Sequence, residues 1–169
     1  MKETEPMNNI NLMVRETECR LRIELRKAKE DLYTAGQNLG DAFGPNCDWH
    51  DNSAADFAVE EYKRIGAREA ELQAALRNVE IIEPRQEIND VGLGNTIIVR
   101  VGDSNEDEKF TLLGPYDGII GQNKVWISYQ SLVGQALMGM KRGETKTFKL
   151  RKGQTQTITV KEILQGELQ

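Results

Sequence analysis

Residues 21–42 read LRIELRKAKEDLYTAGQNLGDA, and this stretch decides the fold. Its small and apolar side chains recur at alternating steps of four and three, at Leu21, Leu25, Ala28, Leu32, Ala35, Leu39 and Ala42. Such steps mark the a and d positions of a heptad repeat, where two helices pack along a narrow seam. The alanines between the leucines suit helices that lie close together. The stretch therefore predicts one arm of a coiled coil.

The heptad pattern stops at Gly44-Pro45-Asn46, because proline disfavours the helical conformation in the residue before it and supplies no N–H donor. A second helix can begin near residues 51–53, which are good capping residues. The seam then resumes, with one polar exception, at Ala58, Tyr62, Ile65, Glu69, Leu72, Leu76 and Val79, and Pro84 ends it. Two heptad helices joined by a short break must lie antiparallel. Residues 8–83 therefore predict an antiparallel coiled-coil hairpin with its tip at 44–53.

The second half of the chain changes character. Short segments rich in β-branched and aromatic residues are separated by Gly, Asp and Asn, and they occupy residues 96–101, 108–113, 125–127, 145–150 and 155–160. Between the third and fourth segments, residues 131–138 are apolar at helical spacing and are closed by Gly139. Residues 84–169 therefore predict a mostly antiparallel β domain with one helix. Together the two parts give an α+β protein.

Charge and cysteine content restrict the class of protein. The net charge is −5, and residues 1–83 hold 11 Lys and Arg against 17 Asp and Glu. Such a chain is a poor candidate for autonomous binding to duplex DNA, which depends on phosphate neutralisation. Cys19 and Cys47 would lie far apart on the hairpin, which indicates a reducing compartment rather than a disulfide framework. No apolar run approaches the roughly 20 residues that span a bilayer. We expect a cytoplasmic monomer without a membrane partner.

A long hairpin followed by a small β-rich domain resembles the Gre transcript-cleavage factors of bacteria. The tip sequence Asp48-Trp49-His50-Asp51-Asn52 matches the family pattern at Asp48, Asp51 and Asn52. Residues 125–148 are similar to the family's succession of strand, helix, glycine-containing turn and strand. The resemblance implies that the second domain has the fold type of the FKBP prolyl isomerases. Similarity of fold does not carry isomerase activity.

The resemblance also implies a function. In this family the hairpin enters the secondary channel of RNA polymerase and the β domain binds the polymerase. Asp48 and Asp51 would hold a second Mg²⁺ there and stimulate cleavage of backtracked RNA at its 3′ end. Mg²⁺ prefers hard oxygen ligands, and two metals stabilise the attacking and leaving oxygens together. The protein would complete an enzyme in trans and would need no cofactor of its own.

The same resemblance suggests supporting residues. Asn52 would orient a carboxylate or cap the second helix, and Trp49 would pack against the polymerase or a backtracked base. A weaker inference places a basic face of the first helix near the RNA, formed by Arg15, Arg22, Arg26 and Lys29.

Two other functions stay open. A Gre-like regulator would occupy the same channel and inhibit the polymerase without promoting cleavage. The residues after Asn52 favour it, because Ala54 and Ala55 stand where the family has Glu-Tyr; Asp51 also departs from the pattern by replacing a longer Glu. A hairpin chaperone would instead expose apolar residues at the tip.

The individual residues also have simpler interpretations. Asp48 and Asp51 are typical turn and cap residues, and the basic face is typical of a solvated coiled-coil flank. Cys47 and His50 are too few ligands for a structural zinc site, and exposed loop histidines are common without acting as general bases.

Overall fold

The computed structural model describes residues 10–43, 53–102, 104, 106–118, 120–121, 124–149 and 154–166. The chain divides into two compact units. The first, called the helical unit below, is formed by residues 18–77, and the second, called the β unit, by residues 1–17 together with 78–169. This division falls a few residues before the predicted boundary at 83, because the segment that follows the second helix is part of the β unit.

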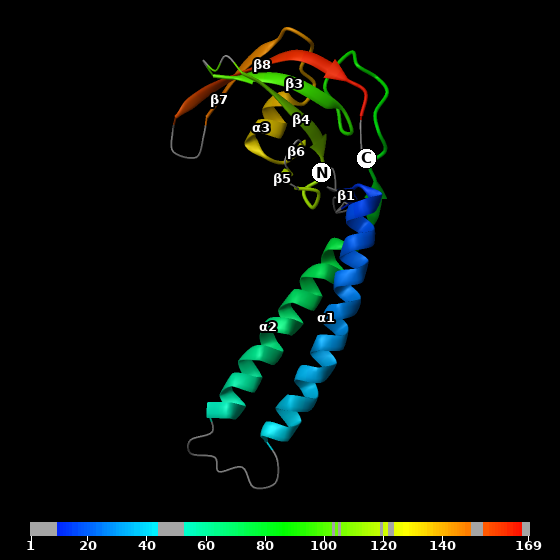
Figure 1. Ribbon diagram of the computed structural model, residues 1–169, viewed down its shortest axis with the longest axis vertical. Helices are drawn as coiled ribbons and strands as arrows, with labels where there is room; N and C mark the ends of the chain where they lie inside the picture. The colour runs from blue at the N-terminus through cyan, green and yellow to red at the C-terminus, as the bar shows by residue number, and fades with distance from the viewer. Residues whose placement is uncertain are drawn as a thin grey trace, which may run out of the picture. The chain divides into compact units, whose positions relative to one another are not determined.

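The helical unit contains two long helices, α1 (Arg15–Ala42) and α2 (Ser53–Ala75), which lie side by side (Figure 1). Arg68 Nη2 of α2 lies 2.8 Å from Glu24 Oε2 of α1. Nearer the other end, a Cβ atom placed on Gly36 would lie 3.5 Å from Tyr62 Cε2. Residue numbers therefore rise along one helix as they fall along the other. The predicted antiparallel arrangement of two helices is confirmed.

The predicted seam of α1 is the buried stripe of that helix. All seven of its positions from Leu21 to Ala42 are buried or half-buried, and most residues between them are exposed. The seam of α2 matches less well. Tyr62 is 39% exposed, because Gly36 opposite it offers no side chain to cover the ring. Ala55 and Ala75 are buried although the predicted seam omits them.

The second helix ends earlier than predicted. It stops at Ala75 rather than near Pro84, and Leu76 and Val79 lie beyond it. Asn78 has a φ of 52°, a left-handed conformation that asparagine tolerates better than most residues and that does not continue a helix. The next residues form strand β2 (Val79–Ile81), which pairs in parallel with β1 (Asn11–Met13). The pairing partner of β2 lies 68 positions earlier in the chain, which no local pattern reveals.

The β unit is built on a second, six-stranded sheet. Its strands are β3 (Thr96–Val101), β4 (Asp107–Leu113), β5 (Ile120–Gly121), β6 (Lys124–Ser128), β7 (Thr145–Lys149) and β8 (Thr155–Leu164), in the order β5-β6-β4-β3-β8-β7. Four neighbouring pairs are antiparallel, and β4 and β6 are parallel. The predicted, mostly antiparallel sheet is confirmed, whereas β5 and the parallel pair were not predicted. The specific FKBP likeness stays a prediction.

One helix packs on this sheet, as predicted. Helix α3 (Leu132–Leu137) is capped by the Ser131 side chain, which accepts a hydrogen bond from Gly134 N at 3.0 Å. Its Leu137 joins a fully buried core with Ile97 and Val99 of β3, Leu112 of β4, and Ile158 and Val160 of β8. Trp126 of β6 is buried and Phe148 of β7 is half-buried, so both rings pack into the interior of the β unit.

A buried carboxylate anchors the segment before α1. Asp117 is fully buried, and its oxygens accept hydrogen bonds from the backbone N–H of Val14 at 3.1 Å and of Gly114 at 3.0 Å. These bonds satisfy donors that would otherwise be buried without partners. No helix in the described ranges is long and apolar enough to cross a membrane.

Candidate functional site on the helical hairpin

The predicted acidic tip lies outside the described residues. This applies to Asp48, Asp51, Asn52 and Trp49, and to Cys47 and His50. The described helices end at Ala42 and begin again at Ser53, so the tip sequence joins the far ends of the two helices. Among the residues that the structure describes, no cluster of three or more His, Cys, Asp or Glu could hold a metal.

The predicted basic face of α1 is on the surface of that helix. Arg15, Arg22, Arg26 and Lys29 are all exposed. Arg22 lies 2.7 Å from Glu18 on the preceding turn, so its charge is partly compensated. Arg15, Arg26 and Lys29 form no ion pair within the described ranges. Three of the four cations are therefore available to an anionic partner.

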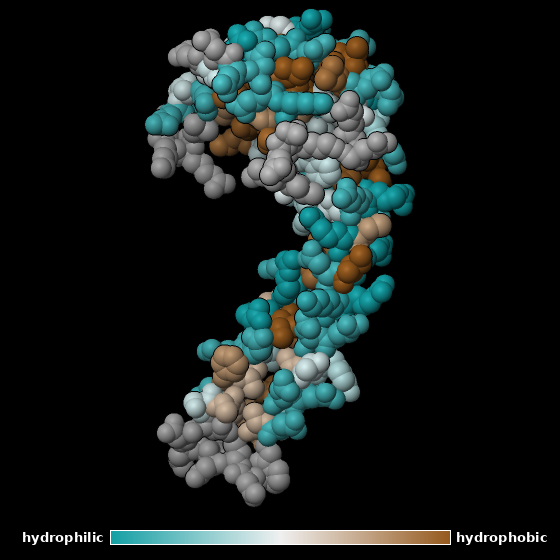
Figure 2. All heavy atoms as spheres, in the orientation of Figure 1, coloured by the Kyte–Doolittle hydropathy of each residue, from teal (hydrophilic) through white to brown (hydrophobic). Residues whose placement is uncertain are grey.

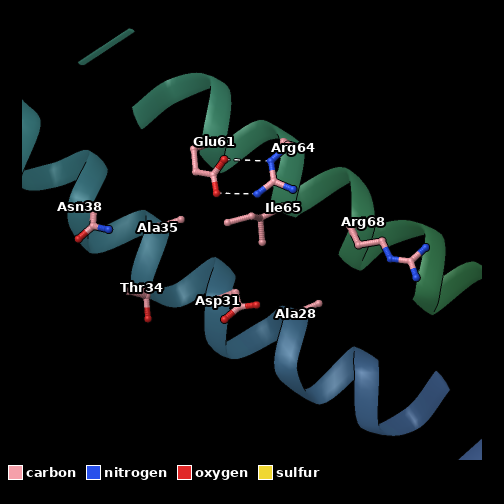
Figure 3. A pocket seen from close by; sticks show the side chains of 9 residues that line it. All are labelled: Ala28, Asp31, Thr34, Ala35, Asn38, Glu61, Arg64, Ile65 and Arg68. Atoms are coloured by element: carbon pink, nitrogen blue, oxygen red, sulfur yellow. Dashed lines mark hydrogen bonds and ion pairs between the residues drawn. The ribbon is translucent and has the colours of Figure 1, made fainter. Parts of the chain in front are cut away.

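One flank of the seam carries a groove of about 360 Å³, and three of its four charged lining residues form ion pairs (Figure 3). We call it the ion-paired groove. Arg64 binds Glu61 through two hydrogen bonds, at 2.6 and 2.9 Å, and Arg68 bonds to Glu24 and Glu71. The hydrogen bond from Arg64 holds the pKa of Glu61 below its usual value. The floor is formed by the seam residues Ala28, Ala35 and Ile65.

The opposite flank carries a groove of about 460 Å³, which we call the aromatic groove. It is lined by Lys29, Leu32, Tyr33, Gly36, Gln37 and Tyr62. Tyr33 is 70% exposed, and its hydroxyl accepts a hydrogen bond from Gln37 Nε2 at 3.1 Å. Sequence reasoning missed this groove because it placed Tyr62 in the seam and gave Tyr33 no role. The sequence does contain a signal for this groove: Tyr33 is an aromatic residue next to the seam position Leu32.

The two flanks lie on opposite sides of α1. Residues of an α-helix are separated by about 100° of rotation. On that spacing, Asp31, Thr34 and Asn38 of the ion-paired groove fall within about 60° of one another. Lys29, Tyr33 and Gly36 of the aromatic groove group on the other side of the seam. The hairpin thus has one flank on which most charged lining residues are ion-paired and one flank with exposed rings and a free cation.

Fold and surface together define a class of protein: a small β unit attached to a helical hairpin that carries acidic residues where its two helices join. The family model "Transcription elongation factor, GreA/GreB, C-term" matches residues 85–165. The transcription elongation factor GreA of Thermotoga sp. (strain RQ2) is 30% identical over 135 residues, covering 77% of this chain and 85% of that protein. GreA of Thermosipho africanus is 31% identical over 135 residues, covering 79% of this chain and 84% of its own length.

Among solved structures, Gfh1 of Thermus thermophilus, a GreA factor homolog, is 25% identical with a TM-score of 0.40. That comparison covers 89% of this chain and 96% of the Gfh1 chain. The chain belongs to the GreA/GreB family of transcription elongation factors. The matched segment, residues 85–165, runs through β3 to β8 and lies wholly within the β unit.

Proposed function

We propose that this protein binds bacterial RNA polymerase, inserts its hairpin into the secondary channel and stimulates cleavage of backtracked RNA. Membership of the GreA/GreB family supports the partner. The observation that carries the proposal is the hairpin itself: two antiparallel helices that end at Ala42 and begin at Ser53, joined by a segment that contains Asp48 and Asp51. Polymerase would supply the nuclease centre, and this chain would act on it in trans.

The donor set of the tip fits Mg²⁺ by its chemistry. Asp48 and Asp51 offer carboxylate oxygens, which Mg²⁺ prefers, and two carboxylates suffice because the ion retains several waters. Bound in the complex, the ion would activate water and stabilise developing charge on the phosphate. Asn52 and Trp49 would position this segment. The exposed cations Arg15, Arg26 and Lys29 would face the RNA phosphates.

The rigid seam suits this role. Catalytic groups lose much of their effect when they are displaced by about 1 Å. A hairpin whose first helix is packed from Leu21 to Ala42 fixes how far along its own axis the two helices end. An unstructured linker of the same length would not do so.

One observation favours an inhibitory regulator as the second candidate. Ala55 in the first turn of α2 is only 3% exposed, and Ala54 carries no polar group. Neither residue can supply the carboxylate or hydroxyl that the family pattern has at these two positions. Such a tip would occupy the channel with fewer groups to assist cleavage. The chaperone alternative would be tested by suppression of client aggregation without polymerase.

The test is RNA cleavage in a stalled, backtracked elongation complex assembled with polymerase from the source organism and Mg²⁺. We expect the protein to shorten the transcript. We expect Asp48→Asn and Asp51→Asn each to reduce the cleavage rate about 100-fold or more while binding to polymerase persists, because each removes a negative metal ligand. Asp41→Asn is the matched control, since Asp41 is an exposed acid on α1 outside the tip.

The alternative outcomes separate the two candidates. Normal cleavage by both tip variants would refute the assignment of Asp48 and Asp51. Slower elongation without added cleavage would favour the inhibitory regulator.

A further inference from the structure

The aromatic residues of the two units are placed differently. In the helical unit, the four described aromatic residues are all exposed: Tyr33 by 70%, Phe43 by 52%, Phe57 by 70% and Tyr62 by 39%. In the β unit, Phe110 and Trp126 are buried in the core, and Tyr116 is 38% exposed. Aromatic rings left in water give up the stabilisation that burial would provide. Exposed apolar groups concentrated on one element mark an interaction surface.

Two of these rings line the aromatic groove together. Tyr33 comes from α1 and Tyr62 from α2, and the floor between them includes Gly36 and Leu32. Gly36 leaves the space beside Tyr62 open, because even a methyl group there would already be in van der Waals contact with the ring. The Gln37 amide holds the Tyr33 hydroxyl from the next turn, which restricts the ring before any partner binds.

The charge around this groove selects the kind of partner. Lys29 lines the groove itself, and Arg26 and Arg22 follow on the same side of α1 at helical spacing. Lys29 and Arg26 have no ion pair within the described ranges, and no carboxylate lines the groove. A groove with aromatic walls, an amide and uncompensated cations matches a base joined to a phosphate. Single-stranded nucleic acids bind to surfaces of this composition through stacking and phosphate contacts.

We propose that the aromatic groove stacks a base of single-stranded RNA between Tyr33 and Tyr62, with Lys29 on the adjoining phosphate. The inference rests on the proposed function, because a backtracked complex displaces the 3′ segment of the RNA from the active site as a single strand. Tyr33 lies nine residues before Ala42, where α1 ends, and Tyr62 lies nine residues after Ser53, so both rings stand about 14 Å back from the helix ends. The groove is therefore a second RNA contact, separate from the acidic tip.

The experiment measures binding of the full-length protein to backtracked elongation complexes whose displaced RNA grows one nucleotide at a time. The acidic tip carries Asp48→Asn throughout, so that the RNA is not cut during the measurement. Each complex is prepared with an intact displaced strand and with abasic nucleotides at single positions. The variants are Tyr33→Leu, which keeps an apolar side chain without a ring, Tyr33→Trp, which keeps a stacking surface, and Asn38→Ala on the ion-paired groove as control.

We expect one abasic position to weaken binding of the parent protein about tenfold, the size of one base–aromatic stack. Tyr33→Leu should show the same loss on intact RNA and no further loss on the abasic RNA. Tyr33→Trp and Asn38→Ala should bind like the parent. The dependence of these effects on one nucleotide position would locate the base in the groove.

Three results would overturn the inference. If Tyr33→Leu weakens binding equally in complexes without displaced RNA, the rings contact polymerase rather than a base. If free nucleotide competes with the parent protein but not with Tyr33→Leu, the groove is a mononucleotide site. If every abasic complex binds the parent like the intact one, the groove holds no base. Failure to bind any elongation complex would instead refute the proposed function, so the two failures are distinguishable.

Discussion

The helical unit and the β unit are built on opposite principles. The helical unit buries a stripe one or two residues wide and leaves the remaining sides of both helices in water; Figure 2 shows hydrophilic residues over most of the visible surface of these helices. The β unit buries a continuous core of eleven residues drawn from three strands, one helix and adjoining segments. Almost every position of the hairpin is therefore available for contact with a partner. The β unit has many positions that tolerate no change.

A helix-breaking substitution should produce the largest difference between the units. Leu32→Pro removes a hydrogen bond in the middle of α1 and should destabilise the hairpin by about 3 kcal/mol or more. The helical signal in far-ultraviolet circular dichroism should fall sharply. The unfolding transition of the β unit should remain, because its core includes no residue from 18–77. Leu32→Ala, which preserves the helix backbone, is the control, and an unchanged helical signal in Leu32→Pro would contradict the seam.

Replacing a glycine by alanine should change the free energy of unfolding in opposite directions in the two units. In α3 a Cβ atom on Gly134 would lie 2.1 Å from the Ser128 carbonyl oxygen and 2.8 Å from Tyr129 Cα, and neither backbone atom can move freely. Gly134→Ala should therefore lower the free energy of unfolding of the β unit by about 2 to 3 kcal/mol. Denaturant unfolding of the full-length protein would measure it. Unchanged stability would mean that the contact between α3 and β6 is looser than described.

The smallest effect is expected on the hairpin. A Cβ atom on Gly40 of α1 would meet no atom within 4 Å, so alanine gains helix propensity without a steric cost. Gly40→Ala should stabilise the helical unit by up to about 1 kcal/mol. Thermal unfolding followed through the helical signal would show a higher midpoint. A lower midpoint would contradict this prediction and would show that the conformation at the C-terminal end of α1 requires glycine at position 40.

The hairpin could be predicted from the local sequence pattern because the apolar a and d positions of the heptad recur several times along each helix. The first seam, from Leu21 to Ala42, matches the buried stripe position by position. Strand β3 was predicted with its observed bounds, because Thr96–Val101 is dense in β-branched residues and bounded by polar or glycine residues. Both signals lie within a single element and depend on no distant partner.

The features that the sequence did not reveal depend on distant partners. The stretch Val79-Glu-Ile is compatible with both helix and strand, and only its pairing with Asn11–Met13 decides between them. The parallel direction of β4 and β6 depends on the path of the chain between them. Tyr62 occupies a seam position yet remains exposed, since its surroundings are set by Gly36 on the other helix. The acidic tip was proposed from a family resemblance, and its residues stay a prediction.

The short parallel pair at the base of the hairpin has a consequence for how such a protein changes over time. Asn11 pairs with Val79 and Met13 with Ile81, so the chain leaves for the hairpin and returns from it at matched positions. An insertion in one helix alone would shift its seam residues out of register with those of the other helix. Seven residues added to each helix would preserve the heptad phase and lengthen the hairpin by about 10 Å. The two helices must therefore change length together, and the hairpin can lengthen or shorten in evolution only by whole heptads added to or removed from both.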